Sequence, residues 1–466
     1  MDLVTKIQDL VKALEAGTPS GAPSSLTQVA ALQEQDLSTV MENTTWQDDE
    51  IKLQKMIKVE SCKSTLAQFN VQLSYGQFGG SAQIEGHVGQ EETSEYVRRT
   101  VPMCFYSHVR RVTDVAKLVA LNGGGNVEDM AAADAAMKIA GDIEFDCFRG
   151  HADFSNQGVF DGSPGAMWIG PNMHGVDVQV RQSDNLRATK DLMFAEYGAN
   201  ETVVIAGGGT LTQENIEDAR VRASIHHGKP DTLFVDPRVL SNYNKIAFNM
   251  QRIVLAGSPQ GATGADLRKQ WVSQGEVNLD SSNFLQGKWQ PAPPRATGPG
   301  APSIAGASVT DAAAVTAFAA SAVYRYYVTS CNELGESVKS NTVAVTIAAL
   351  GDKVELTITH PGSGVVRFFN VYRTLAGGAA GTEKFIGRVA LRVGQATTIF
   401  TDLGNKLPGF VTGFLIENKT LQFKELAPYS RKKLAETDMS SVEAHYRYVT
   451  LAVPAPRKNV LIDNLR

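Results

Sequence analysis

The sequence has few cysteines, and none of them lie close together. Its four cysteines are spread over 466 residues and form no CxxC pair; they are Cys62, Cys104, Cys147 and Cys331. A disulfide framework needs paired cysteines and an oxidising environment, so scattered thiols fit a reducing compartment better. We therefore do not expect a small secreted module held together by disulfides.

Long hydrophobic runs and a strong net charge are also lacking. No apolar run approaches the roughly 20 residues that cross a bilayer. The opening MDLVTKIQDLVKALEAG places charged residues between Leu3, Ile7, Leu10 and Leu14, which predicts an amphipathic helix rather than a signal peptide. The net charge of −5 argues against wrapping nucleic acid by charge alone, although a local basic face remains open. We expect a protein of the cytoplasm with no membrane partner.

No motif of an active site is present. The patterns GxGxxG, GxxxxGK[ST], HExxH and GxSxG are all absent. The adjacent His226 and His227 would point in different directions on a helix, so they do not form a metal pair. Gly207–Gly209 follows a predicted strand, but a lone glycine cluster is a weak phosphate-binding signal. We predict no catalytic, cofactor-binding or metal-binding residues, and the protein is predicted not to be an enzyme; a nucleotide-dependent enzyme is the weaker alternative.

The residues that are present predict a mixed α+β chain. A helix over 1–16 is followed by a flexible linker over 17–25. The longest helix is predicted over 126–150, where Ala, Met and Glu favour the helical conformation. Asn126 caps its start and Gly150 ends the helix.

A region of alternating strands and helices follows. ETVVIAGGG predicts a strand and a turn, and TLTQENIEDARVRASIHHG predicts a helix with a capping box of Thr210 and Gln213. DTLFVDP predicts a buried strand, and RVLSNYNKIAFNM predicts another helix. Beyond Leu421 the sequence predicts longer elements of mixed type.

A glycine-rich, charged loop lies between two alternating strands. Alternation of apolar and polar residues predicts strands around 69–75 and 101–105, and the loop between them has little to bury. A loop of this length needs a partner surface, and its opposite charges suit a surface that meets a copy of itself. The candidate intersubunit contact residues are Glu85, Glu91, Glu92, Glu95, Arg98 and Arg99.

A segment of short strands is inserted near the C-terminal end. It begins after the Pro/Gly-rich stretch WQPAPPRATGPGAP and has the strand spacing of a β-sandwich. The predicted strands cover 324–329, 342–347, 353–359, 365–373, 384–389 and 398–401. YYVTSCNELGESVKSNTVAVTI resembles the last two strands of a fibronectin-type domain. Too few residues precede this stretch for five earlier strands, so we place the hairpin early or centrally in the module.

These segments, in this order, resemble the major capsid protein of tailed bacteriophages, which has the Hong Kong 97 fold. The resemblance rests on FNVQLSYGQFGG…EGHVGQEETSEYVRRTVPMCFYS, on the long helix and on TLFVDPRVLSNYNKI. It extends to WQPAPPRA before the insertion and to LQFKELAPYSRKKLAETDMSSVEAHYRYVTLAVPAPRKNVLIDNLR after it. The closest likeness is to capsid proteins of large contractile-tailed phages, which carry an immunoglobulin-like insertion near the C-terminus.

The resemblance implies an α+β, Hong Kong 97-like capsid fold with an inserted all-β immunoglobulin-like sandwich. The implied divisions are an N-terminal arm (1–65), an extended loop with its flanking strands (66–107), a peripheral domain with the long helix (108–159), an axial domain (160–296), the sandwich (297–410) and a C-terminal return to the capsid core (411–466).

The implied function is self-assembly into hexamers and pentamers of an icosahedral shell around packaged double-stranded DNA. The implied partners are the chain itself, DNA bound non-specifically on the inner face, and portal, scaffold or decoration proteins. The implied location is the virion capsid, assembled in the host cytoplasm. A surface-binding protein that displays an immunoglobulin-like module stays open as an alternative, although it predicts a secretion signal and a terminal module.

Overall fold

The structure is a computed structural model. It describes residues 45–76, 81–89, 91–118, 126–150, 172–181, 202–247, 268–285, 299–310, 317–332, 335–362, 364, 366–392, 394–435 and 438–466. The predicted first helix and the linker after it lie outside these residues. No helix within the described ranges is both long and apolar enough to cross a membrane.

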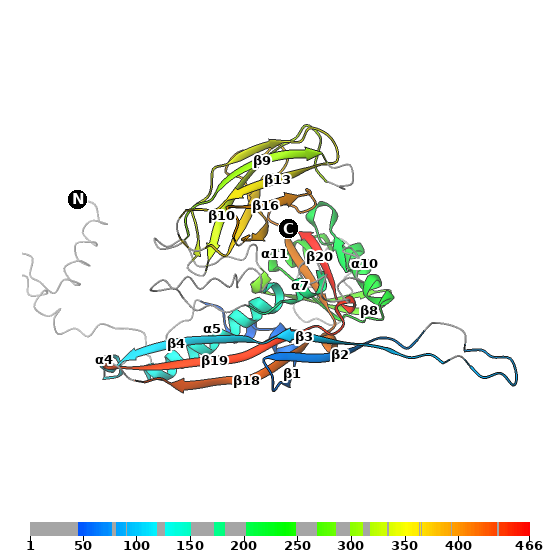
Figure 1. Cartoon of the computed structure of the whole chain (residues 1–466), viewed down its shortest axis with the longest axis horizontal. Coiled ribbons are helices and arrows are strands. Elements are labelled where there is room, and N and C mark those ends of the chain that lie inside the picture. Colours follow the sequence, from blue (N-terminus) through cyan, green and yellow to red (C-terminus); the bar gives the residue numbers. More distant parts are fainter. Residues whose placement is uncertain are drawn as a thin grey trace, which may run out of the picture.

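The longest helix lies along a four-stranded sheet (Figure 1). This helix, α5 (Val127–Arg149), begins where the Asn126 side chain accepts a hydrogen bond from the Glu128 amide at 3.1 Å, and it ends before Gly150. The predicted helix and its cap are therefore confirmed. The sheet has the order β1-β18-β19-β4, with β1 (Lys58–Ser61), β18 (Gln422–Lys433), β19 (Ser440–Ala452) and β4 (Cys104–Thr113).

The central strands of the second sheet are buried on both faces. Its order is β5-β20-β17-β6-β8-β7, with β5 (Val203–Ile205), β20 (Val460–Leu465), β17 (Val411–Ile416), β6 (Thr232–Val235), β8 (Gly275–Ser281) and β7 (Lys269–Val272). Alternate residues of β6 enter two different cores, with Phe234 on the side of α5 and Leu233 on the other. This explains the continuous apolar run that predicted a buried strand.

Three further helices accompany this sheet: α7 (Val176–Arg181), α10 (Gln213–Ile225) and α11 (Pro237–Ala247). The predicted capping residue of α10 was wrong. The Thr212 hydroxyl accepts the hydrogen bond from the Asn215 amide at 3.2 Å, so Thr212 rather than Thr210 is the cap. Both threonines suit the role, and the position at which the chain turns into the helix selects between them.

The inserted segment forms two antiparallel sheets around its own core (Figure 1). One sheet has the order β11-β10-β14-β15, with β12 also paired to β10, and the other has the order β16-β13-β9. Their bounds are β9 (Ser303–Thr310), β10 (Val323–Asn332), β11 (Gly335–Glu336), β12 (Val343–Thr346), β13 (Asp352–Thr359), β14 (Phe368–Arg373), β15 (Lys384–Ala390) and β16 (Thr397–Asp402). All six predicted strands are present, and β9 and the two-residue β11 were missed.

The insertion is fastened to the rest of the molecule. The Arg388 guanidinium donates a hydrogen bond to the Arg149 carbonyl at the end of α5, at 2.8 Å. Where the chain leaves the sandwich, the Asn464 side chain of β20 accepts from the Leu407 amide at 3.0 Å and donates to the Asn405 carbonyl at 2.6 Å. These contacts tie the sandwich to α5 and to the six-stranded sheet.

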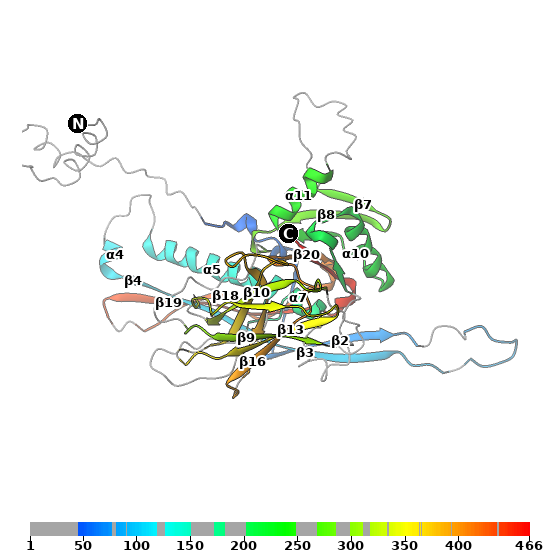
Figure 2. The same cartoon turned by 90° about the horizontal axis from the view of Figure 1, so that it is seen from above.

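An extended hairpin projects from the body (Figures 1 and 2). It consists of β2 (Leu66–Ser74) and β3 (Glu95–Pro102), which pair antiparallel from Leu66 opposite Pro102 to Ser74 opposite Glu95. The predicted pair of strands with a projecting loop is confirmed. The tail after Leu421, predicted as mixed elements, instead forms the long strands β18 and β19 followed by β20.

The chain before the hairpin is locked onto α5. The Glu144 carboxylate is fully buried and accepts hydrogen bonds from three successive amides, those of Lys52 (3.1 Å), Leu53 (2.8 Å) and Gln54 (2.8 Å). These amides open the short helix α3 (Leu53–Met56), whose first N–H groups have no partner of their own within the helix. Glu144 thus supplies the cap from a distant element.

We expect Glu144→Gln to weaken this lock. One carboxylate oxygen becomes an NH₂ group, so at least one buried amide loses its acceptor, at about 2–3 kcal/mol of unfolding free energy. Urea unfolding of the full chain measures the loss. Asp142→Asn on the same helix is the control, because its side chain is 55% exposed and pairs with Lys138 at the surface. Equal stability of the two variants would contradict the assignment.

Candidate functional site

The predicted contact residues lie on the projecting hairpin. Glu85, Glu91, Glu92, Glu95 and Arg98 are exposed there, and Arg98 donates to the Asn70 side chain across the hairpin at 3.3 Å. Arg99 differs from the others, because it is only 7% exposed. The structure therefore places five of the six candidates on one exposed element and the sixth inside its own chain. Their contact with a neighbour stays a prediction.

The loop of the hairpin has charge of one sign, and exposed apolar side chains lie on it and beside it. From Tyr75 to Glu95 the sequence contains four glutamates and no lysine or arginine. The exposed apolar residues on the same element are Tyr75 (88%), Ile84 (81%), Val88 (90%) and Tyr96 (66%). Large apolar side chains gathered on one projecting element mark a surface that is covered in an assembly.

A second exposed surface lies on the four-stranded sheet, on the face turned away from α5. The Tyr106 hydroxyl reaches Asp146 of α5 at 2.8 Å, so its neighbours Phe105 and Val109 point to the opposite face. Phe105 is 54% and Val109 is 52% exposed. The Tyr448 ring packs edge-on against Phe105 with 4.9 Å between ring centroids. This face is aromatic and accessible.

Basic residues of β4 and β18 gather at the far end of this sheet. Arg111 pairs with Asp438 at 2.7 Å and Arg431 pairs with Glu443 at 2.6 Å, whereas Lys432 and Lys433 are exposed. Figure 1 shows that the ends of β18 and β4 and the tip of the hairpin lie at opposite ends of the molecule. The acidic hairpin therefore cannot reach these lysines within one chain.

The outer edge of β18 is irregular. β1 pairs only with Lys424 and its neighbours, from Gln422 to Glu425, and no described strand pairs with the rest of this edge. The register of β18 with β19 shifts twice, between Glu425 and Ala427 and between Ala427 and Ser430, and Pro428 lies within the strand. Bulges, a proline and terminal lysines are the features that prevent an edge strand from pairing with another sheet.

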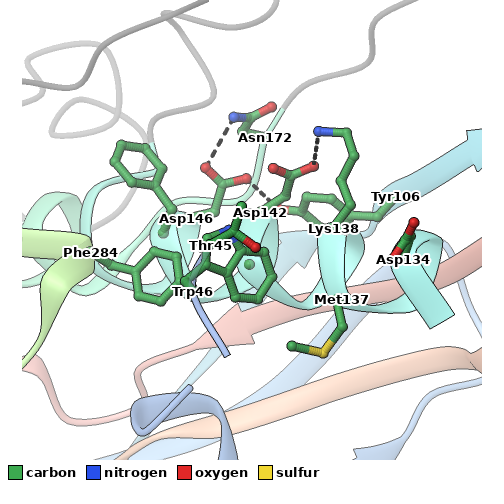
Figure 3. A pocket seen from close by; sticks show the side chains of 12 residues that line it. Thr45, Trp46, Tyr106, Asp134, Met137, Lys138, Asp142, Asp146, Asn172 and Phe284 are labelled. Atoms are coloured by element: carbon green, nitrogen blue, oxygen red, sulfur yellow. Dashed lines mark hydrogen bonds and ion pairs between the residues drawn. The ribbon is translucent and has the colours of Figure 1, made fainter. Parts of the chain in front are cut away.

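A cavity of about 830 Å³ lies between the N-terminal segment, α5 and the 3-10 turn at Asn283–Leu285 (Figure 3). Trp46 and Phe284 form one wall, with ring centroids 5.7 Å apart. The Trp46 ring lies so close to α5 that a Cβ at Gly141 would be 2.5 Å from it, which requires glycine at that position. The cavity is thus shaped by the same docking that involves Glu144.

Asp146 is the buried polar group of this cavity. Its carboxyl accepts from the Tyr106 hydroxyl at 2.8 Å and from the Asn172 amide at 3.1 Å (Figure 3). Burial raises the pKa of Asp146 to about 7, and the nearby Asp142 charge acts in the same direction, while the two hydrogen bonds offset part of the effect. Burial also raises the pKa of Tyr106. Asp146 joins β4 to α5.

The glycine turn at Gly207–Gly209 serves the fold. Gly208 and Gly209 have φ values of 75° and 88°, and the Gly209 carbonyl accepts from the Arg466 amide. The start of α10 is separate and is capped by Thr212, so this turn does not present helix amides to a phosphate. In the described part of the chain, no group of three or more His, Cys, Asp or Glu residues is placed to hold a metal ion.

Comparison with known proteins identifies relatives along nearly the whole chain. No protein-family model matches the sequence. A protein of Enterococcus phage phiEF24C, provisionally described as a major capsid protein, is 24% identical over 459 residues, covering 95% of this chain and 92% of that protein. The major capsid protein of Staphylococcus phage S25-3 is 23% identical over 472 residues, covering 98% and 95%. The chain is a relative of phage major capsid proteins.

Solved structures of low sequence identity were also found. The capsid of a native GTA particle matches with a TM-score of 0.46 and 10% identity, covering 96% of this chain and 100% of that one. A chain of Gordonia phage Cozz matches with a TM-score of 0.45 and 8% identity, covering 96% of each.

The α+β architecture predicted from the sequence is confirmed, and its elements follow the order that the resemblance to the Hong Kong 97 fold implies. A projecting hairpin, a long helix on a four-stranded sheet and a second sheet with its own helices follow the predicted order, and the relatives bear the name that the resemblance implied. The divisions at 65, 107, 159, 296 and 410 stay predictions, as does the immunoglobulin-like character of the sandwich.

Sequence reasoning missed the aromatic sheet face and Asp146. The alternation of Tyr446 and Tyr448 in HYRYVT, and of Phe105 in CFYSHV, was a signal for strands with an aromatic face. The pairing that joins them, Tyr448 opposite Phe105, is set by tertiary structure. For Asp146 no local pattern existed, because its partners are distant in the sequence.

We expect Asp146→Asn to change how stability depends on pH. With a folded pKa of about 7 and an unfolded value near 3.9, the folded chain holds a proton that the unfolded chain has released. This group therefore stabilises the fold at low pH, and the contribution is lost as pH rises through 7. Between about pH 5 and about pH 8, the free energy of unfolding that is lost from this group amounts to about 3 kcal/mol.

The measurement is urea unfolding of the wild-type chain and the variant at both pH values. The wild type should lose more stability than Asp146→Asn on going to high pH. Asp134→Asn at the exposed rim of the same cavity is the control and should behave like the wild type. Parallel pH profiles for wild type and Asp146→Asn would contradict the assignment.

Proposed function

We propose that this chain is a phage major capsid protein, which assembles into hexamers and pentamers of an icosahedral shell around packaged double-stranded DNA. The observation that carries the proposal is the similarity to major capsid proteins along nearly the full length of both chains. The exposed hairpin supports it independently, because it is a structural element whose apolar side chains have no place to be buried within its own body.

The hairpin is the element proposed to lie across a neighbouring subunit. Ordering a long polar loop opposes folding through lost conformational entropy, and contacts with a neighbour offset that loss. A stable shell needs large repeated interfaces, of roughly 2,000 Å² or more each. Glu85, Glu91, Glu92, Glu95 and Arg98 would then set register and partner choice through charge, while the apolar residues supply most of the affinity.

The positions of the two charged ends favour a head-to-tail arrangement. The acidic hairpin and the exposed Lys432 and Lys433 lie at opposite ends of one chain. An interface between two different surfaces of identical subunits is heterologous, and it closes into a ring when the rotation between subunits permits. Rings of six and of five subunits are the units of the proposed shell.

The remaining partners follow from this proposal. Packaged DNA would meet the inner face non-specifically, because a net charge of −5 gives no strong attraction for phosphates. Portal, scaffold and decoration proteins would contact the assembled shell. The proposed location is the virion capsid, after assembly in the host cytoplasm, and the proposed role is structural rather than enzymatic.

Charge reversal on the hairpin tests the interface. In Glu85→Lys, Glu91→Lys, Glu92→Lys the loop becomes basic, so we expect a loss of rings and shells in electron micrographs and a shift to single subunits in sedimentation. Reversal of Glu214 and Asp218 to lysine on α10 is the control, since both are exposed and lie on a different element.

Two outcomes separate the parts of the proposal. If the wild type and both variants all form shells, the proposed role of the hairpin charges is wrong, while the proposed capsid function stands. A wild-type chain that stays monomeric, alone and with the other structural proteins of its phage, would overturn the function itself.

A further inference from the structure

Two histidines face each other across the four-stranded sheet. His445 of β19 pairs directly with His108 of β4. Residues directly opposite each other in an antiparallel ladder project from the same face, with Cβ atoms about 5 Å apart. His445 is fully buried and His108 is half-buried. Tyr106 projects from the face that meets α5, so His108, two residues further along β4, projects there as well.

His445 is held by Tyr429 of β18. The Tyr429 hydroxyl lies 2.8 Å from His445 Nδ1, and the two rings are stacked with centroids 6.1 Å apart and an angle of 20°. The same hydroxyl lies 3.5 Å from the Ala132 carbonyl of α5. The hydroxyl has one proton, which the Ala132 carbonyl accepts, so its oxygen accepts from His445 Nδ1–H and Nε2 is the unprotonated nitrogen of the neutral ring. Tyr429 thereby connects β18, β19 and α5.

The carboxylates around the pair are already engaged. Glu443 Oε2 lies 3.9 Å from His445 Nε2 but accepts from Arg431 at 2.6 Å. Asp142 of α5 pairs with Lys138 at 3.3 Å. The remaining charged group that acts on both rings is Arg110 of β4. Arg431 also lies 3.9 Å from Asp129 of α5. The positively charged side chains near the two rings are therefore at least as many as the negatively charged ones.

We propose that His108 and His445 form an acid-operated switch, which holds the four-stranded sheet against α5 near neutral pH and loosens this contact when both rings take up protons. Each ring gains one proton from solvent. The proton on His445 goes to Nε2, a buried atom with no hydrogen-bond partner in the described part of the chain, so a charge is placed inside the packed sheet without a new hydrogen bond to offset its lost solvation. Two like charges placed directly opposite each other on a sheet then repel.

The electrostatic environment agrees with this geometry. Burial lowers the pKa of both His108 and His445, and Arg110 acts in the same direction on each. Below about pH 6.5 the unfolded chain therefore binds more protons than the folded chain. Stability contributed by the neutral pair is present above that pH and is lost as pH falls through it. The switch lies within one chain and does not depend on the proposed shell.

The test removes the titration while keeping a side chain that can hydrogen-bond in place of each ring. The double variant His108→Asn, His445→Asn and the wild type are melted as full chains at about pH 8 and about pH 5, the range in which histidine changes charge. On going from about pH 8 to about pH 5, the change in the wild-type midpoint should be several degrees less favourable than the change in the variant, because the opposite contribution of Asp146 is present in both chains. His87→Asn on the exposed hairpin is the control and should keep the wild-type difference.

Hydrogen exchange on the wild type alone provides a second measurement should the double variant fail to fold. After correction for the intrinsic effect of pH, peptides of α5 over 132–142 should exchange faster at the lower pH, while peptides of α10 should not. An equal change in midpoint for the wild type and the double variant would overturn the proposal. Unchanged protection of α5 at the lower pH would overturn it as well.

Discussion

The packing of α5 between two sheets is the constraint on which the rest of the structure depends. The C-terminal half of this helix is buried, and Phe148 contacts Phe234 and Phe414 of the six-stranded sheet with ring centroids 5.6 and 5.3 Å away. Residues of β4, β18 and β19 belong to the same core. One helix thereby holds both sheets in a fixed relation, and that relation determines the direction in which the hairpin projects.

Polar contacts on α5 add what apolar packing cannot. Glu144 fixes the N-terminal segment, Asp146 fixes β4, and the carbonyl of Arg149 fixes the sandwich through Arg388. Each contact is directional, so it selects one orientation of the attached element, whereas apolar burial tolerates many. α5 therefore fixes the orientations of the sandwich, the N-terminal segment and the sheet relative to one another. A subunit with several simultaneous neighbours requires such a fixed arrangement.

Much of the fold could be predicted from local patterns, and the misses have physical causes. The α5 helix and six sandwich strands showed clear periodicity, and their bounds were close to those observed. β9 was missed because SIAGASVT has small residues and weak alternation. The length of β18 was missed because Pro428 and two register shifts break its period. The hairpin followed from the alternation in its two strands and from the composition of the loop between them, whereas the Tyr448–Phe105 contact and the surroundings of Asp146 depend on partners far away in the sequence.

The irregular edge of β18 has a consequence for how copies of this chain come together. An edge that cannot be extended by backbone hydrogen bonds keeps the sheets of different copies from fusing into an unbroken ladder. Association is then left to side chains, whose contacts are individually weak and can be undone. A wrongly placed copy can leave and rejoin, and small changes of angle between neighbours remain available. Reversibility and variable curvature are what a closed container built from one kind of part requires.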